Sequence, residues 1–301
     1  MAAAPIRYYH RARAREEIEE IFGERWLRFA YEHPVGRLAV WLLARRVLFS
    51  RWYGYRMSRP ASARLILPFI ARYNLDVDEF ATSPFRFEHF NAFFYRALRP
   101  GCRPLAPGAN VAVLPADGRH LVFPDVEAAD GFYVKGARFS LAELLDDADL
   151  AARFAGGAMV ISRLCPVDYH RFHFPVAGVP GEPRRVQGWL YSVSPIALRR
   201  RIRYLVENQR EVTLVESPTF GPVAVLEVGA TNVGSILQSF VPGRPVAKGD
   251  EKGLFAFGGS CVITLFARGR IRFDADLVAQ SARHLETYAR MGESLGTAPS
   301  A

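Results

Sequence analysis

The chain has little lysine, little cysteine and no long hydrophobic run. Its three lysines, at positions 135, 248 and 252, stand against 36 arginines, a bias that indicates a GC-rich bacterial genome. The three cysteines, Cys102, Cys165 and Cys261, have no CxxC spacing. That spacing argues against a zinc site or a disulfide framework and favours a reducing compartment. The longest apolar run near the N-terminus, residues 38–43, is far shorter than the ~20 residues that a spanning helix needs.

Half of the 301 residues are hydrophobic, and the net charge is +9. A chain of this length buries a full core in one large domain or two modest ones. Excess arginine by itself suggests nucleic acid, but here the positive charge gathers at one end beside large apolar residues. We therefore expect no nucleic-acid partner. Residues 1–15 hold no continuous apolar stretch and acids follow directly, so we expect neither a signal peptide nor a transit peptide.

The sequence predicts helices over residues 12–98. Ile18, Ile21 and Phe22 have helical spacing after an acidic first turn. Between Arg25 and Arg72 there are ten arginines and one acid, interleaved with tryptophan and tyrosine. Such a composition is typical of helices at a membrane interface. A pair of basic helices packed on the domain, with solvated arginines, would have the same composition. The charge asymmetry favours an anionic membrane surface.

After Pro100 the sequence consists of short runs rich in β-forming residues, separated by proline and glycine. Strands are expected at residues 110–114, 120–123, 158–164, 212–216, 223–228, 253–257, 262–266 and 271–273. One helix, 140–154, opens with a capping box of Ser140 and Glu143; another is expected over 277–291, before a loose tail from Gly292. The predicted fold is α+β: a helical, membrane-associating segment (1–98), then a mainly antiparallel β-sheet or barrel-like catalytic body (99–301).

Three separated segments carry side chains that could do chemistry. Asp117 sits in Pro-Ala-Asp-Gly, which an ordinary turn also explains. His170 and His173 are concentrated acid/base groups, although core histidines are the plain alternative and no acidic or cysteine cluster accompanies them as metal ligands. Ser260 follows two glycines, as a hairpin or bulge would also require. Because Val262 replaces the second glycine of a Gly-x-Ser-x-Gly elbow and a strand follows, an α/β-hydrolase is disfavoured.

Taken together, these segments resemble the phosphatidylserine decarboxylases. Order and separations agree over roughly residues 60–290. The matching motifs are residues 90–96 with 98–101, 115–118, 169–175, 220–222, 228–230 and 252–260. One departure is Cys261, where threonine or serine is usual, and it places a second nucleophile beside the first.

The resemblance implies that Ser260 attacks the carbonyl of Gly259, with Asp117 and His173 as the charge relay. The chain would become a β fragment (1–259) and an α fragment (260–301) that stay associated, the latter capped by a pyruvoyl group derived from Ser260. That group would condense with phosphatidylserine to a Schiff base and act as the electron sink for decarboxylation to phosphatidylethanolamine. His170 would be the proton donor to the α-carbon. A peripheral position on the cytoplasmic face of a bacterial inner membrane is implied, while a homo-oligomer stays open.

Three alternatives remain at the level of the sequence. A pyruvoyl decarboxylase could act on a soluble amino acid, which would make the basic segment incidental. An uncleaved serine hydrolase could use Asp117, His173 and Ser260 on an external ester or amide. A non-enzymatic lipid-binding β module would need none of these side chains.

Overall fold

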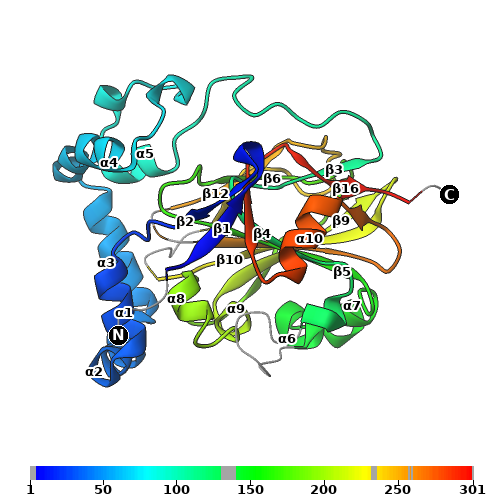
Figure 1. Cartoon of the computed structure of the whole chain (residues 1–301), viewed down its shortest axis with the longest axis horizontal. Coiled ribbons are helices and arrows are strands. Elements are labelled where there is room, and N and C mark those ends of the chain that lie inside the picture. The colour runs from blue at the N-terminus through cyan, green and yellow to red at the C-terminus, as the bar shows by residue number, and fades with distance from the viewer. Residues whose placement is uncertain (1–4, 130–139, 232–235, 257, 259, 300–301) are drawn as a thin grey trace.

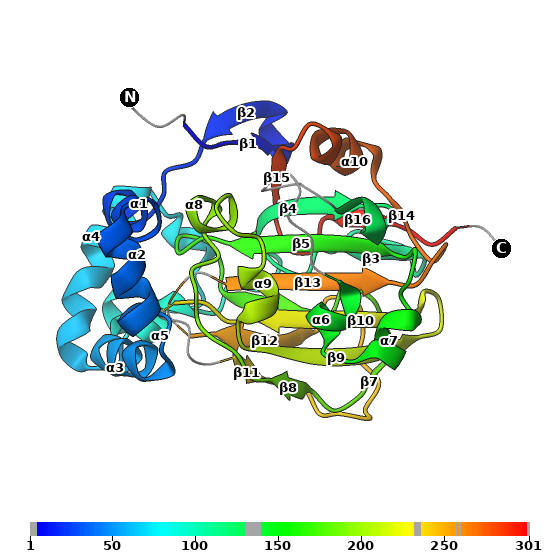
Figure 2. The ribbon, with the colours of Figure 1, turned by 90° about the horizontal axis from the view of Figure 1, so that it is seen from below.

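The computed structural model describes residues 5–129, 140–231, 236–256, 258 and 260–299. In this part of the chain a large mixed sheet forms a middle layer, with short helices on one face and two smaller sheets on the other (Figure 1; Figure 2). The fold is thus α+β, as the sequence predicts.

Among the described residues the large sheet has ten strands. Their order is β2 (Arg15–Ile18), β1 (Arg7–His10), β15 (Glu286–Ala289), β4 (Gly118–Phe123), β5 (Ala158–Leu164), β13 (Ser260–Phe266), β10 (Gly221–Val228), β9 (Arg210–Ser217) and β7 (Val179–Pro180), with β8 (Arg184–Val186) also paired to β9. β1 runs parallel to β15, and the other pairs are antiparallel. The smaller sheets are β11 (Ile236–Gln238), β12 (Glu251–Phe255) and β6 (Arg171–His173), and β14 (Arg272–Phe273), β16 (Ser294–Thr297) and β3 (Val111–Val113).

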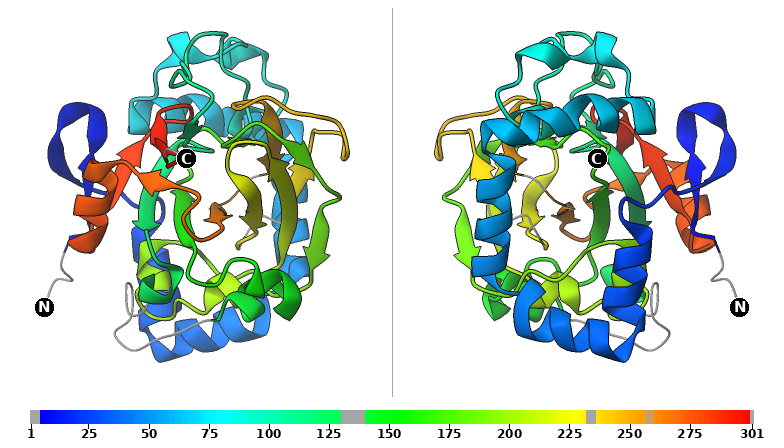
Figure 3. Two further views of the ribbon diagram at one scale, coloured as in Figure 1. Left: turned by 90° about the vertical axis from the view of Figure 1, so that its right-hand side faces the viewer. Right: turned by 90° about the vertical axis from the view of Figure 1, so that its left-hand side faces the viewer.

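The helices are short. They are α1 (Glu24–Glu32), α2 (Pro34–Ala39), α3 (Val47–Met57), α4 (Ile66–Tyr73), α5 (Phe90–Phe94), α6 (Leu141–Leu145), α7 (Ala148–Ala152), α8 (Pro195–Leu198), α9 (Tyr204–Glu207) and α10 (Ala275–Ala282). A π-helical turn, η2 (Val40–Ala44), and 3-10 turns at Arg11–Arg13, Pro60–Leu65, Val77–Glu79, Pro84–Arg86 and Val126–Ala129 complete them. Figure 3 shows α1 to α4, in blue, arranged around one end of the sheet. Within the described ranges, no helix combines the length and the apolar character that crossing a bilayer requires.

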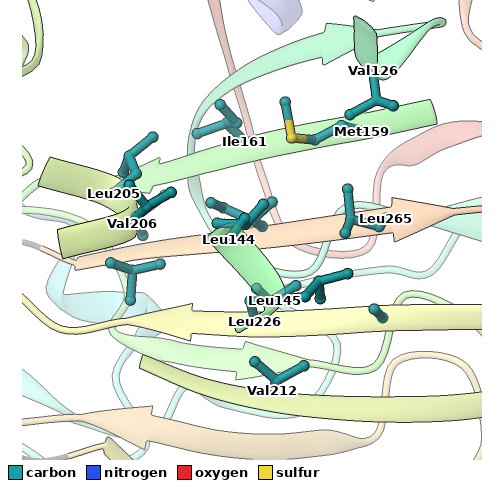
Figure 4. Close-up of a cluster of buried hydrophobic side chains, with 14 of the residues drawn as sticks. Val126, Leu144, Leu145, Met159, Ile161, Leu205, Val206, Val212, Leu226 and Leu265 are labelled. Atoms are coloured by element: carbon teal, nitrogen blue, oxygen red, sulfur yellow. The ribbon is translucent and has the colours of Figure 1, made fainter. Parts of the chain in front are cut away.

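Strand alternation divides the core between the two faces of the large sheet. On β5, Met159 and Ile161 join the cluster under α6 and α9, which Figure 4 shows, whereas Val160 joins the cluster under the smaller sheets. Successive side chains of a strand point to opposite faces, so a strand buried on both faces reads as a continuous apolar run. All seven residues of β5 are buried accordingly.

The predicted β body is confirmed, with strands at 158–164, 223–228 and 262–266 inside the observed ones. The capping box is confirmed too: Glu143 N donates to Ser140 Oγ (3.1 Å) and Ser140 N donates to Glu143 Oε2 (3.0 Å). The single helix over 140–154 was wrong. Asp146 adopts a left-handed φ of 52°, which ends α6, and Asp147 then caps α7.

The helical prediction for residues 12–98 was wrong at its start. Residues 7–18 form the hairpin β1–β2, and helix begins only at Glu24. β1 extends the sheet beside β15, and Tyr8 contacts Tyr288 there. Pairing with a strand almost 280 residues away therefore overrides the local helical spacing of Ile18 and Phe22.

The C-terminal predictions were also wrong. α10 ends after Ala282, and the residues that were expected to continue it form β15 against β4. The tail from Gly292, expected to be loose, contains β16, which pairs with β3 and β14. In both cases the segment pairs with strands that would otherwise leave an open sheet edge. Local sequence periodicity does not report such long-range pairing.

The close approach of β4 to β5 gives a stability prediction. A Cβ at Gly118 would lie 2.5 Å from the carbonyl oxygen of Arg163, so Gly118→Ala should destabilise the fold by about 1–3 kcal/mol through a forced backbone shift. Gly54 in α3 has open space around it, and Gly54→Ala should stabilise by up to about 1 kcal/mol. Urea unfolding followed by circular dichroism measures both. Equal stability of Gly118→Ala and the wild type would contradict the contact.

Candidate active site

Ser260 is the first residue of β13, and its side chain is fully buried. β13 is an interior strand, since it pairs with β5 on one side and β10 on the other. By alternation Ser260 shares a face with Val262 and Phe266, which belong to the cluster beneath the smaller sheets. The serine therefore points toward the layer that carries the histidine segment.

Cys261 lies on the opposite face of β13. Its side chain belongs to the hydrophobic cluster that packs on the helices, together with Ile263 and Leu265. Burial raises the pKa of the Cys261 thiol, which keeps it protonated. The second nucleophile suggested by the sequence is thus turned away from the site of Ser260 and is inert.

His170 is the histidine that contacts the serine. Its Nδ1 lies 3.4 Å from Ser260 Oγ, its Nε2 lies 2.9 Å from the carbonyl oxygen of Cys165, and its ring stacks on Phe94 at 3.9 Å between centroids. Because a carbonyl only accepts, Nε2 carries the proton and Nδ1 offers a lone pair to the serine hydroxyl. Burial lowers the pKa of His170 to about 3, so the ring is neutral.

His173 is anchored differently, at the end of β6. Its Nδ1 lies 2.9 Å from the carbonyl oxygen of Gly249, so Nδ1 donates and Nε2 holds the free lone pair. That Nε2 is buried without a hydrogen-bond partner among the described residues. Burial lowers the pKa of His173, while the hydrogen bond to Gly249 and, after it, the charges of Glu251 and Asp117 oppose the shift. A buried nitrogen with a fixed tautomer and an unused lone pair is poised to accept a proton.

Asp117 lies in the turn before β4 and is almost fully buried. Arg103 grips both carboxylate oxygens, with the shortest contact at 2.6 Å, and Met291 N donates to Oδ1 at 2.8 Å. These charge-assisted hydrogen bonds hold the carboxylate in one orientation.

The structure brings Ser260 and His170 together. Within the described residues no hydrogen bond joins Asp117 to His173, or His173 to Ser260, so the relay implied by the resemblance stays a prediction. Gly259, the expected attack site, lies outside the described residues.

A network of buried charges stands behind the site. Arg163 binds Glu19 (2.8 Å) and Glu286 (2.6 Å), and Arg119 binds Asp168 (2.5 Å). The Asp168 carboxylate accepts from Cys165 N at 2.6 Å, and the carbonyl of the same residue orients His170. The sequence analysis missed these residues, because a buried arginine in an arginine-rich chain has no pattern that separates it from a solvated one.

A largely apolar cavity of about 510 Å³ leads to the segment just before Ser260. Its walls come from α1, α3 and the segments around Cys165 and Ser194, and it reaches Gly258. Gly258 has a φ of 139°, a conformation open to glycine and strained for other residues. A site of this shape suits an elongated apolar ligand with a polar end.

Comparison with known proteins gives consistent matches. A family model described as phosphatidylserine decarboxylase matches residues 90–297, a range that takes in Asp117, both histidines and Ser260. A phosphatidylserine decarboxylase proenzyme of Chlamydia trachomatis is 46% identical over 296 residues, 98% of either chain. The proenzyme of Chlamydia pneumoniae is 45% identical over 96% of either chain, and that of Desulfitobacterium hafniense is 40% identical over 97% of this chain and 98% of its own.

The orientation of Cys261 generates a prediction about cleavage before Ser260. Cys261→Ala should cleave as the wild type does and lose only about 1 kcal/mol of stability, since it removes a small buried group. Intact-mass spectrometry of the purified variant measures the cleavage. A Cys261→Ala protein that stays a single chain would show that the thiol takes part.

Proposed function

This chain belongs to the phosphatidylserine decarboxylase family and is a carboxy-lyase; from that premise we propose that it converts phosphatidylserine to phosphatidylethanolamine with a pyruvoyl group made from Ser260. The observation that carries the proposal is the buried Ser260 hydroxyl, 3.4 Å from a neutral histidine at the start of an interior strand. His170 fixes this hydroxyl in place, and a positioned hydroxyl becomes an activated nucleophile once a base takes its proton.

Self-cleavage is proposed as an attack of Ser260 Oγ on the carbonyl of Gly259. The hydroxyl proton passes to a base, the peptide C–N bond breaks, and the freed amine takes up a proton, which leaves an ester. Elimination then breaks the Oγ–Cβ bond, so residues 1–259 leave with a carboxylate and residue 260 becomes dehydroalanine. One water molecule hydrolyses its imine tautomer and releases ammonia. Nothing but water is consumed.

Two histidines serve two tasks in this proposal. His173, whose buried Nε2 has no hydrogen-bond partner among the described residues, would take the serine proton during cleavage. His170 already lies against the atoms of Ser260, so its Nδ1 would take up one proton from solvent and deliver it to the substrate α-carbon, where it replaces the carboxylate that leaves as carbon dioxide. The pyruvoyl carbonyl, once formed, supplies the electron sink that loss of carbon dioxide requires.

The cleaved fragments would stay associated. β13 keeps its hydrogen bonds to β5 and β10, and β15 keeps those to β4 and β1, all of which belong to residues 1–259. The fragment 260–301 is therefore built into the large sheet on both sides, and the buried pair of Glu286 with Arg163 adds a further tie.

A lipid substrate is supported by the cavity and by the surface beside it. Between residues 26 and 67 many large apolar side chains are exposed: Trp26, Phe29, Val35, Leu38, Trp41, Leu42, Leu43, Leu48, Trp52, Tyr55, Leu65 and Leu67. Together with the arginines of this segment they suit an anionic membrane surface. We propose that residues 1–98 dock on the inner face of a bacterial membrane and that 99–301 carry the catalysis. Membership of the phosphatidylserine decarboxylase family does not favour the alternative of an uncleaved serine hydrolase.

The division of labour predicts different outcomes for two neighbouring variants. His173→Ala should remain a single chain, whereas His170→Ala should cleave but lose decarboxylation by about 100-fold or more, because no acid faces the α-carbon. Intact mass and carbon dioxide release measure the two steps. His120→Gln, at another buried histidine that contacts Ser162, is the control and should retain both. An uncleaved His170→Ala beside a cleaved His173→Ala would reverse the assignment.

If residues 26–67 dock on a membrane, a variant in this segment should lose membrane binding and keep self-cleavage. Leu48→Asp places a carboxylate on an exposed position of α3 (76% exposed) and should weaken sedimentation with phosphatidylserine vesicles by about tenfold. Val241→Asp, which alters an exposed position outside residues 26–67, is the control. Both variants should cleave normally. Equal binding of the two, or decarboxylation of free serine at the rate for the lipid, would contradict a membrane-bound substrate.

A further inference from the structure

Arg96 is a buried cation without a carboxylate partner. The residue comes two positions after the end of α5, and 5% of its surface is exposed. Among the described residues it has one hydrogen bond, a long contact of 3.5 Å from Nη1 to the carbonyl oxygen of Phe93, and its Nε has no partner there. The guanidinium lies over the rings of Phe80 (4.6 Å) and Phe93 (5.0 Å). Within the described residues, no ion pair joins Arg96 to an acid.

Two other buried arginines of this chain, Arg163 and Arg210, are satisfied. A third, Arg45, also has an unpartnered Nε, but its Nη1 donates to the hydroxyl of Tyr191 at 2.8 Å. Arg163 binds two carboxylates, and Arg210 donates four hydrogen bonds to backbone carbonyls. A buried arginine with a structural role therefore looks like Arg210. Burial lowers the pKa of Arg96 to about 10, so it is still charged at neutral pH, and an unmatched buried charge is costly unless something binds it.

The acids near Arg96 are already engaged. Asp117 is gripped by Arg103, Asp168 by Arg119, and Glu79 by Arg103 (3.0 Å) and Arg290 (2.9 Å). The N–H groups of the Arg96 guanidinium are thus left for a group that the protein itself does not supply.

Arg96 belongs to the surroundings of the site. Phe94, two residues earlier, stacks on His170, and the carbonyl of Tyr95 accepts from Arg171 Nε at 3.0 Å. The charge of Arg96 is close enough to His170 to add to the lowering of the histidine pKa that burial begins. An anion bound by Arg96 would thus lie on the side of the site where Phe94 packs on His170, the histidine that contacts Ser260.

We propose that Arg96 binds the phosphodiester of the substrate headgroup and so positions the serine moiety at Ser260 and His170; this rests on the proposed function. A guanidinium matches the oxygens of a phosphate with two parallel hydrogen bonds. The substrate carboxylate is the other anion, but its charge leaves as carbon dioxide forms, so binding it would stabilise the ground state more than the transition state. The phosphodiester keeps its charge throughout, and binding it costs no rate.

The test compares processed Arg96→Met enzyme with wild type in mixed micelles. Arg96→Met should raise KM for phosphatidylserine by about tenfold or more while kcat changes by less than about threefold. Glycerophosphoethanolamine, which has the phosphodiester and no carboxylate, should lose inhibition by a similar factor. O-methylserine, which has the carboxylate and no phosphodiester, should inhibit as before. Thermal stability should not fall, whereas Arg210→Met, the structural control, should unfold at a clearly lower temperature.

Unchanged constants for phosphatidylserine and glycerophosphoethanolamine would overturn the assignment, and so would a loss of inhibition confined to O-methylserine. A fall in stability equal to that of Arg210→Met with unchanged KM would make Arg96 structural. If Arg96→Met does not fold or cleave, Arg96→Lys decides, because it keeps the charge and loses the fork: KM should rise by about threefold, and no rise contradicts the proposal. A wild type inactive on phosphatidylserine would refute the proposed function, whatever Arg96 does.

Discussion

The site depends on the hydrogen bonding of β13 on both sides. Because β5 and β10 hold this strand, its first residue, Ser260, has a fixed backbone and a buried side chain that cannot turn to solvent. Alternation along the same strand sends Cys261 to the opposite face. One constraint thus selects the nucleophile, presents it to the histidine segment and would keep residues 260–301 in place after the bond before them is cut.

Buried charges supply the second level of order. Arg103 holds Asp117, and Arg119 holds Asp168, whose carboxylate binds the backbone N–H of Cys165, the residue whose carbonyl orients His170. Each pair is costly to bury, and the short charge-assisted hydrogen bonds within it offset that cost. Burial in turn keeps His170 neutral, so that its one free nitrogen can face the serine. Arg96 differs from these residues in having no acid of its own, and that difference gives it a role toward the substrate.

Much of the β body could be predicted from the sequence, and the ends of the chain could not. β5 and β13 are runs of apolar residues bounded by turns, and local pattern suffices to find them. β1 and β15 form because the edge of the sheet needs partners, a demand set by residues far apart in the chain. In the site, the motifs located Asp117, His170, His173 and Ser260, but only the fold showed which histidine touches the serine. The arginines around them carry no local signal, since arginine is common throughout this chain.

The central claim is that Ser260 becomes the reactive group by cutting its own chain. Intact-mass spectrometry of the purified wild-type protein tests it most directly. The account predicts two fragments, 1–259 and 260–301, the second lighter than its encoded mass by one ammonia. Ser260→Ala should give a single chain. A wild-type protein that decarboxylates phosphatidylserine as one uncut chain of 301 residues would contradict the account.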